Sequence, residues 1–212
     1  PREVATAAGP GDGALLEVLA PIFEQVIAVD RSAARLELAQ HRATARQFRN
    51  VRFVCGELDG PAGNDAVREA APKRGGADVV FAACKERVQI PEVAVPEQRK
   101  QPGAADDVFV ARMLHHARVP QRAVHALVRL ALPRGDSERG GAVIILDYES
   151  HRDDALREQQ ADLWLGFDPG ELEAMAHQAG LCDIQRGRLP KAWNGDGPDR
   201  QPSWPWLAGR RA

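Results

Sequence analysis

The chain has 212 residues, a formal net charge of −2 and 27% charged residues. This length suits one α/β domain with a sizeable core, and the charge balance gives no electrostatic argument for a nucleic-acid partner. No window approaches the roughly 20 apolar residues that a membrane-spanning helix needs, and the first residues lack the charged-then-apolar pattern of a secretory signal. We therefore expect a soluble cytoplasmic protein that binds a small molecule and neither a membrane nor a nucleic acid.

A glycine-rich turn lies near the start of the chain. The turn is Gly9-Pro10-Gly11-Asp12-Gly13, and it stands between the apolar run 4–8 and the helical pattern 14–19. A second apolar run, 26–29, then ends in Asp30. A strand, a glycine turn, a helix and a strand ending in an acid form half of a nucleotide-binding βαβ unit. In such a unit the glycines let the backbone approach the ligand, and the acid accepts both ribose hydroxyl hydrogens.

The spacing of the glycines separates two classes of ligand. A dinucleotide fingerprint reads G-x-G-x-x-G, whereas Gly9, Gly11 and Gly13 form the tighter pattern G-x-G-x-G. This pattern resembles motif I of the class I S-adenosylmethionine-dependent methyltransferases, whose ligand carries no phosphate. The resemblance implies that the turn packs against a sulfonium amino acid and its ribose.

Further segments follow in the order of that family. A strand over 50–57 ends in an acid, and the segment from Asp107 to His116 resembles motif IV with the residues after it. An amphipathic helix is expected over Pro120–Leu132 and a strand over Gly140–Tyr148. The resemblance covers nearly the whole chain. It implies an α/β fold, a Rossmann-like three-layer α/β/α sandwich whose sheet is mostly parallel.

The last part of the sequence predicts two helices and a closing hairpin. One helix carries the apolar positions between Leu156 and Trp164. The next begins at Asp168, because Asp168 and Glu171 have the spacing of a capping box. Two strands, 182–189 and 204–209, are separated by a turn-rich segment and are expected to pair antiparallel.

Within the family, the chain looks closest to small-molecule enzymes of the ubiquinone/menaquinone-biosynthesis type. The stretch from Leu114 to Phe167 also looks like methyltransferase domains fused to arsenic-repressor-type regulators. The resemblance implies S-adenosyl-L-methionine as cofactor and methyl transfer to a small-molecule acceptor, a reaction of the EC 2.1.1 type. It also admits a homodimer, or a fused or associated regulatory domain.

The resemblance implies a set of cofactor-binding residues as well. Asp30 would bind the ribose, and Glu57 would lie near the adenine. The structural alternative is a surface acid at a strand end for Asp30 and an ordinary loop acid for Glu57. We favour ligand contact for Asp30 and leave both interpretations open for Glu57. The full set of expected cofactor contacts is Gly9, Gly11, Gly13, Asp30, Arg31, Glu57, Leu58 and Arg112.

Four side chains are candidates for the chemistry. Methyl transfer from a sulfonium is an in-line displacement, so the protein must hold the nucleophile and, where needed, accept its proton. His115 and His116 follow the fourth strand, at the carboxyl edge where open α/β sheets bind ligands. Tyr148 and His151 follow the fifth strand at the same edge. Each could act as the general base. Alternatively, one histidine of the pair faces solvent and the other packs beneath the next helix.

Three cysteines and two aromatic residues have structural as well as functional interpretations. Cys55, Cys84 and Cys182 are far apart, with no C-x-x-C pair or Cys/His cluster, so the sequence predicts no metal site. Scattered thiols are compatible with arsenite methylation, but free cysteines are more often small buried hydrophobes. Trp164 and Phe167 could line a substrate pocket, although their helical context favours core packing.

The chain departs from the family pattern at its start. Only 1–3 precede the first strand, whereas the family has leading helices, so we expect a fragment or a cover supplied from elsewhere. Ala7 stands where the family has an acid, and Asp12 is a nearby acid that could replace it. One alternative function is therefore a non-catalytic sensor or scaffold that binds S-adenosylmethionine. An NAD-dependent oxidoreductase is disfavoured by the glycine spacing and the closing hairpin.

A single methyltransferase domain over 1–212 needs an insertion at about 60–105. We expect an extra strand or helix within it, because long structureless loops are uncommon in compact domains. Asp78 could begin the fourth strand instead of Asp107. We favour Asp107, since it leads without a gap into His115 and the helix that follows.

Overall fold

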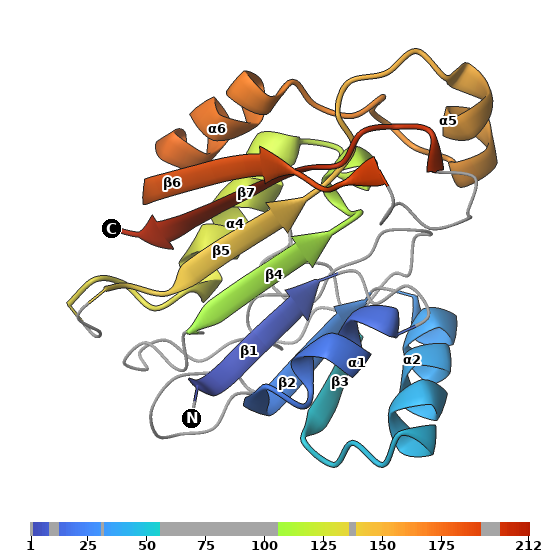
Figure 1. Ribbon diagram of the computed structural model, residues 1–212, viewed down its shortest axis with the longest axis vertical. Coiled ribbons are helices and arrows are strands. Elements are labelled where there is room, and N and C mark those ends of the chain that lie inside the picture. Colours follow the sequence, from blue (N-terminus) through green and yellow to red (C-terminus); the bar gives the residue numbers. More distant parts are fainter. Residues whose placement is uncertain (1, 9–12, 31, 56–105, 136–138, 192–199) are drawn as a thin grey trace, which may run out of the picture.

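The computed structural model describes residues 2–8, 13–30, 32–55, 106–135, 139–191 and 200–212. Within these ranges seven strands form one sheet in the order β3-β2-β1-β4-β5-β7-β6 (Figure 1). Neighbouring strands run parallel, except that β7 is antiparallel to both β5 and β6. The strands are β1 (Arg2–Ala8), β2 (Phe23–Asp30), β3 (Val51–Cys55), β4 (Asp107–Ala111), β5 (Ala142–Leu146), β6 (Leu181–Arg188) and β7 (Pro205–Arg211).

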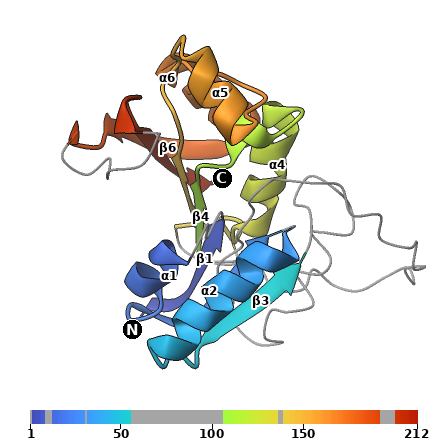
Figure 2. The same cartoon turned by 90° about the vertical axis from the view of Figure 1, so that its right-hand side faces the viewer.

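Helices cover both faces of the sheet. The chain moves from β1 to β2 in one direction and from β4 to β5 in the other, so right-handed crossovers place α1 and α4 on opposite faces. Figure 2 shows these two helices on the two sides of the strands. Among the helices of the described ranges, none has the length and apolar character needed to cross a membrane. The helices are α1 (Ala14–Leu19), α2 (Ala33–Ala45), the 3₁₀ turn η1 (Leu114–His116), α4 (Pro120–Leu130), α5 (Asp154–Gln160) and α6 (Pro169–Gln178).

The core lies between the sheet and these helices. In β2 the run 26–29 is completely buried, as expected for a parallel strand that is covered on both faces. In α4 the buried positions Ala123, Val124, Leu127 and Val128 follow the helical period. This stripe packs in the same apolar cluster as β4 and β5.

The predicted fold class is confirmed, and so is the position of the fourth strand. β4 begins at Asp107 and pairs with β1 on one side and β5 on the other. Asp78 and the insertion at about 60–105 lie outside the described residues. The closing hairpin is confirmed as β6 and β7, and β7 lies between β5 and β6.

The cap of α6 is confirmed too. The Asp168 carboxylate accepts hydrogen bonds from the backbone N–H groups of Gly170 at 2.8 Å and Glu171 at 3.3 Å. These bonds satisfy donors that would otherwise lack a partner in the first turn of the helix. The start of α6 could therefore be predicted from the sequence, because the cap is a contact between residues two and three positions apart.

The segment after α5 differs from the prediction. The helix ends at Gln160, because Ala161 adopts a left-handed conformation with φ of 53°. Trp164 lies beyond the helix and is 43% exposed, so the expectation that it packs in the core is wrong, whereas Phe167 is buried as expected. Cys55 is exposed, contrary to the expectation of a buried thiol, because it ends the edge strand β3.

Candidate functional site

The direction of the chain reverses between β1 and β4. From β1 the chain continues through α1 to β2 on one side, while β4 lies on the other side and leads away through α4 to β5. Open α/β sheets bind ligands outside the carboxyl ends of the strands at this kind of switch point. Figure 1 shows the carboxyl ends of β1, β4 and β5 at one edge of the sheet. The candidate catalytic residues follow β4 and β5, and the candidate cofactor contact Asp30 ends β2, which runs parallel to β1.

Gly13 is the N-cap of α1 and has a backbone conformation that favours glycine. Its φ is 92°, in the left-handed region. A Cβ at this position would lie 3.0 Å from the Cα of Ala39 in α2. The residue therefore serves two structural purposes: it supplies the left-handed conformation directly before α1, and it lets α1 and α2 approach closely. Gly9 and Gly11 lie outside the described residues.

Asp30 ends β2 and is completely buried. Its Oδ1 accepts a hydrogen bond of 2.8 Å from the N–H of Ser32, the residue that caps α2. Asp30 pairs with Cys55 of β3 in the parallel register, so its carboxylate lies at the carboxyl edge of the sheet. Arg31, Glu57 and Leu58 lie outside the described residues, and ligand contact at Asp30 stays a prediction.

A second buried acid, Asp147, follows β5. Three backbone N–H groups donate to its carboxylate: those of Leu114 at 2.8 Å, Met113 at 3.2 Å and Tyr148 at 2.8 Å. The Nδ1 of His115 lies 2.5 Å from its Oδ1. Burial alone raises the pKa of Asp147, but the facing imidazole of His115 and these hydrogen bonds hold the pKa below the ordinary 3.8.

This contact sets the tautomer of His115. Because Asp147 is a carboxylate, it accepts from an N–H at Nδ1, and in the neutral ring the Nε2 atom then carries the lone pair. Asp147 is not among the site residues predicted from the sequence, although it follows an apolar strand just as Asp30 does. The same signal could have found it.

The four candidate catalytic side chains form one aromatic cluster. The ring of His115 stacks on Tyr148 at 4.4 Å between centroids, and the ring of His116 lies 4.2 Å from His115. Tyr148 also contacts His151 and Trp204, at 5.7 and 4.7 Å. Neither histidine of the pair faces solvent, since His115 is 2% exposed and His116 is 8% exposed. The alternative with one solvent-facing histidine is therefore wrong.

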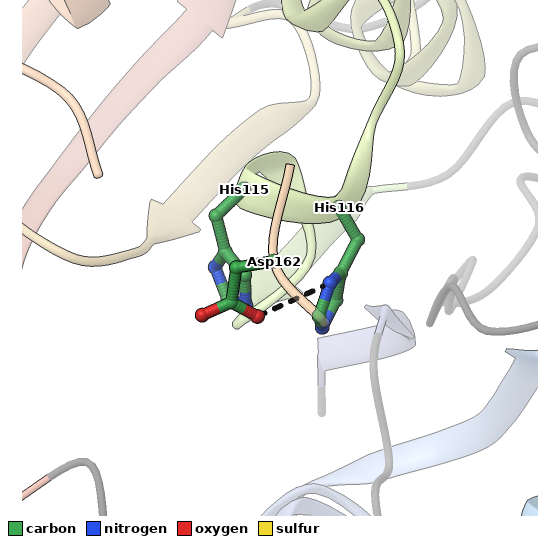
Figure 3. A group of neighbouring side chains, drawn as sticks. All are labelled: His115, His116 and Asp162. Carbon is green, nitrogen blue, oxygen red and sulfur yellow. Dashed lines mark ion pairs between the residues drawn. The ribbon is translucent and has the colours of Figure 1, made fainter. Parts of the chain in front are cut away.

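A third acid, Asp162, faces both histidines (Figure 3). Its Oδ1 lies 3.6 Å from Nε2 of His115 and 3.4 Å from Nδ1 of His116. Asp162 comes from the turn after α5, far from the histidines in sequence. No periodicity or motif marks this residue, so the sequence offered no signal for it.

Arg112, which was expected among the cofactor contacts, contacts the end of β5 and the residue before β7. Its backbone N–H donates to the carbonyl of Leu146 at 2.9 Å, and its φ is 57°. Its guanidinium carbon lies 5.5 Å from the ring centroid of Trp204, within the range of a cation–π contact. A role in cofactor binding stays a prediction.

A hollow of about 620 Å³ lies beside β6, β7 and the start of α6, and none of the four candidate catalytic residues lines it. Glu149 and Arg188 line it and form an ion pair. The hydrogen bond from this guanidinium lowers the pKa of Glu149. Arg188 is exposed and Glu149 is half-buried, so solvent screens the pair and it contributes little to stability.

Comparison with known proteins gives the fold a name. The sequence profile of a family described as "Methyltransferase domain" matches residues 6–84, and no curated protein matches the chain. Among solved structures, the N-methyltransferase NodS of Bradyrhizobium japonicum WM9, in complex with S-adenosylhomocysteine, has a TM-score of 0.59 at 13% identity over 99% of this chain and 78% of that chain. The fold is the Rossmann-like methyltransferase fold.

Two further structures have this methyltransferase fold. A putative methyltransferase of Bacillus halodurans C-125 has a TM-score of 0.61 at 12% identity, over 99% of this chain and 93% of that chain. Phosphoethanolamine N-methyltransferase 2 of Haemonchus contortus, with S-adenosylmethionine, has a TM-score of 0.62 at 14% identity. That match covers all of this chain and 50% of the other. The profile match ends before β4, so the second half of the methyltransferase fold rests on structural likeness.

Proposed function

We propose that this protein transfers a methyl group from S-adenosylmethionine to a small-molecule acceptor. The observation that carries the proposal is the buried carboxylate of Asp30, which ends β2 at the carboxyl edge of the sheet of a methyltransferase fold. A carboxylate at this position offers two oxygens to the two ribose hydroxyl groups. The cofactor-bound structures among the solved neighbours support the same ligand.

The cofactor would lie along the carboxyl edge of β1 and β2. Its ribose would contact Asp30, and its methionine end would extend from the glycine turn toward β4. This places the methyl group near the side chains that follow β4 and β5. The residues proposed for cofactor contact are those expected from the sequence, namely Gly9, Gly11, Gly13, Asp30, Arg31, Glu57, Leu58 and Arg112.

The acceptor would lie against the cluster of His115, His116, Tyr148 and His151. Of these four, His115 is best arranged to take a proton, because Asp147 orients its ring and leaves the lone pair on Nε2. The buried Asp147 carboxylate would also stabilise the imidazolium that forms. A buried proton acceptor suits a small acceptor molecule. The ubiquinone/menaquinone-biosynthesis type and the arsenic-repressor-associated type are the acceptor classes that we propose to test first.

A non-catalytic sensor is the second candidate, and Ala7 favours it. This residue pairs in β1 with Ala28 and Phe109, at the position where the related enzymes have an acid. Without that carboxylate the methionine end of the cofactor would be held less firmly. Turnover separates the two candidates: transfer of a labelled methyl group to any member of a broad acceptor panel supports the enzyme.

Calorimetric titration tests the ligand class. We expect S-adenosylhomocysteine to bind with one site per chain and NAD to give no saturable heat. Tight binding of NAD with no response to S-adenosylhomocysteine would reject the proposal and favour an oxidoreductase. Binding of S-adenosylhomocysteine without turnover on the full acceptor panel would favour the sensor.

A further inference from the structure

We propose that His115, His116 and Asp162 form a binding site for a divalent transition-metal ion, and that Zn²⁺ fits it best. One donor atom of each residue lies within 4.8 Å of those of the other two, and Nε2 of His115 and Nδ1 of His116 are the nitrogens that approach Oδ1 of Asp162. All three residues are buried, and they converge on one point from two segments (Figure 3). The inference rests on this geometry and does not depend on the methyl-transfer proposal.

The distances between donor atoms suit a shared ion better than direct hydrogen bonds. The carboxylate oxygen lies 3.6 Å from His115 and 3.4 Å from His116, whereas N–H···O bonds measure about 2.7–3.2 Å. Ligand atoms that each lie about 2.0 Å from a tetrahedral Zn²⁺ are about 3.3 Å apart. The two distances to the carboxylate are therefore close to the edges of a zinc tetrahedron. For one ion to bind both rings at about 2.1 Å, the two imidazole nitrogens, which lie within 4.8 Å of each other, must also come within about 4.2 Å.

The protonation of His115 also suits a metal ligand. Asp147 accepts the Nδ1 hydrogen at 2.5 Å, so the neutral ring directs its Nε2 lone pair toward Asp162. A lone pair and a carboxylate that face each other at 3.6 Å repel, so this contact needs a positive charge at Nε2, either a proton or a metal ion. A carboxylate that binds the far nitrogen of a metal-ligating histidine is the usual outer shell of zinc sites. Asp147 supplies that outer shell here.

Backbone hydrogen bonds hold the ligands in place without an ion. The carbonyl of His115 accepts from the N–H groups of Leu163 and Trp164, both at 3.0 Å. The indole N–H of Trp164 donates to the carbonyl of Ala117 at 2.8 Å. These three bonds fasten the turn that carries Asp162 to the segment that carries the histidines. A prearranged set of ligands lowers the entropy cost of binding.

The donor set selects the kind of ion. Two imidazole nitrogens and one carboxylate oxygen match Zn²⁺ and its neighbours in the first transition row, whereas Mg²⁺ and Ca²⁺ prefer oxygen ligands alone. Three protein ligands leave a fourth position for water, or for an oxygen, nitrogen or sulfur atom of an acceptor. The positive charge would also offset the buried carboxylates of Asp147 and Asp162.

Metal binding and proton acceptance use the same lone pair of His115. The ring can bind an ion or take a proton, but it cannot do both at once. If the ion is bound, it replaces the imidazole as the group that acidifies the acceptor. The methyl-transfer proposal and the metal-site proposal therefore both use Nε2 of His115. In the first this atom accepts a proton, and in the second it binds the ion.

Titration of the metal-depleted native chain tests the site. We expect Zn²⁺ to bind with one ion per chain and to raise the melting temperature, since an ion that binds the folded state stabilises it. Co²⁺ should give the absorption of a tetrahedral nitrogen–oxygen site, without a thiolate charge-transfer band. No saturable binding of either ion would overturn the proposal. A thiolate band would overturn it too, because it would locate the ion at a cysteine such as Cys55.

Two pairs of variants locate the site. Asp162→Asn and His116→Gln each remove one ligand, and each should weaken Zn²⁺ binding by more than the roughly 10- to 100-fold that loss of an outer-shell partner costs. The matched controls make the same changes at exposed positions, Asp154→Asn in α5 and His125→Gln in α4, and should bind Zn²⁺ as the native chain does. Unchanged affinity in the first pair would overturn the proposal.

The outcome does not depend on the cofactor or on whether the variants fold. Zn²⁺ is titrated without S-adenosylhomocysteine, and S-adenosylhomocysteine is titrated in the presence of a chelator, so either proposal can fail while the other stands. If both ligand variants unfold, the Co²⁺ spectrum of the native chain decides between nitrogen–oxygen and thiolate ligation.

Discussion

A buried acid stands at the carboxyl end of one strand in each half of the sheet: Asp30 in β2 and Asp147 after β5. The two acids have different surroundings. Asp30, after β2, accepts a hydrogen bond from the N–H of Ser32. Asp147, after β5, accepts from three backbone N–H groups and from His115. The first half thus presents a buried carboxylate at the carboxyl edge of β2, where a ligand is expected. The second half uses its carboxylate to position another side chain. The same sequence signal can therefore mark a ligand contact or a structural anchor.

The largest expected effect is the loss of stability when Asp147, which positions His115, is replaced. Asp147→Asn removes a buried carboxylate that accepts four hydrogen bonds. Whichever way the new amide turns, its NH2 group faces the N–H of His115 or backbone N–H groups, which costs about 3–5 kcal/mol in unfolding free energy. Urea denaturation measures this loss. Asp154→Asn is the control. It loses only an exposed ion pair with Arg157 in the first turn of α5 and should change stability by no more than about 1 kcal/mol. Equal stability of the two variants would contradict the anchor role.

The next effect is on ligand affinity, at the other acid. Asp30→Ala removes two hydrogen bonds between a carboxylate and the ribose, each worth about 1.5–3 kcal/mol, so the Kd for S-adenosylhomocysteine should rise at least about 100-fold. Glu24→Ala, at an exposed position of the same strand, should leave the Kd unchanged. Calorimetry measures both. If the two variants bind equally well, the cofactor does not contact Asp30.

A pair of glycines tests the turn that precedes α1. Gly13→Ala suffers from a φ of 92° and from a Cβ placed 3.0 Å from Ala39, and we expect a loss of about 2–3 kcal/mol. Gly180→Ala has a similar φ of 95° but no atom within 4 Å of the new Cβ, so strain alone should cost about 1–2 kcal/mol. Denaturation curves compare the two. A smaller loss at Gly13 would mean that α1 and α2 are not closely packed there.

The smallest expected effect is a dependence on pH. The pKa of Asp147 is lower in the folded protein than its ordinary value of 3.8. Its ionised form therefore stabilises the fold above that value, and the stabilisation is lost as the pH falls through the folded pKa. The stability difference between the native chain and Asp147→Asn should be constant near neutral pH and shrink below pH 3.8. A difference that grows on acidification would contradict the lowered pKa.

The sequence predicted the features that depend on local contacts. Apolar runs located the strands, and the spacing of Asp168 and Glu171 located the start of α6, because a cap is formed within one turn. The position of Asp107 at the start of β4 followed from its continuity with the segment after it. The order of these elements was enough to predict the methyltransferase fold.

The sequence could not predict contacts that tertiary structure creates. Asp162 reaches the histidines because the backbone after α5 bonds to the carbonyl of His115, and no local pattern encodes that meeting. Trp164 looked like a core residue, but Ala161 ends the helix before it and leaves its ring half-exposed. The absence of Cys/His spacing likewise predicted no metal site, although the fold assembles three potential ligands.

A structure of the chain with S-adenosylhomocysteine tests the central claim most directly. We predict that the ribose hydroxyl groups lie on the carboxylate of Asp30 and that the sulfur atom is directed from the glycine turn toward His115. A ligand bound elsewhere, for example in the hollow beside Glu149 and Arg188, with Asp30 not in contact, would contradict the account.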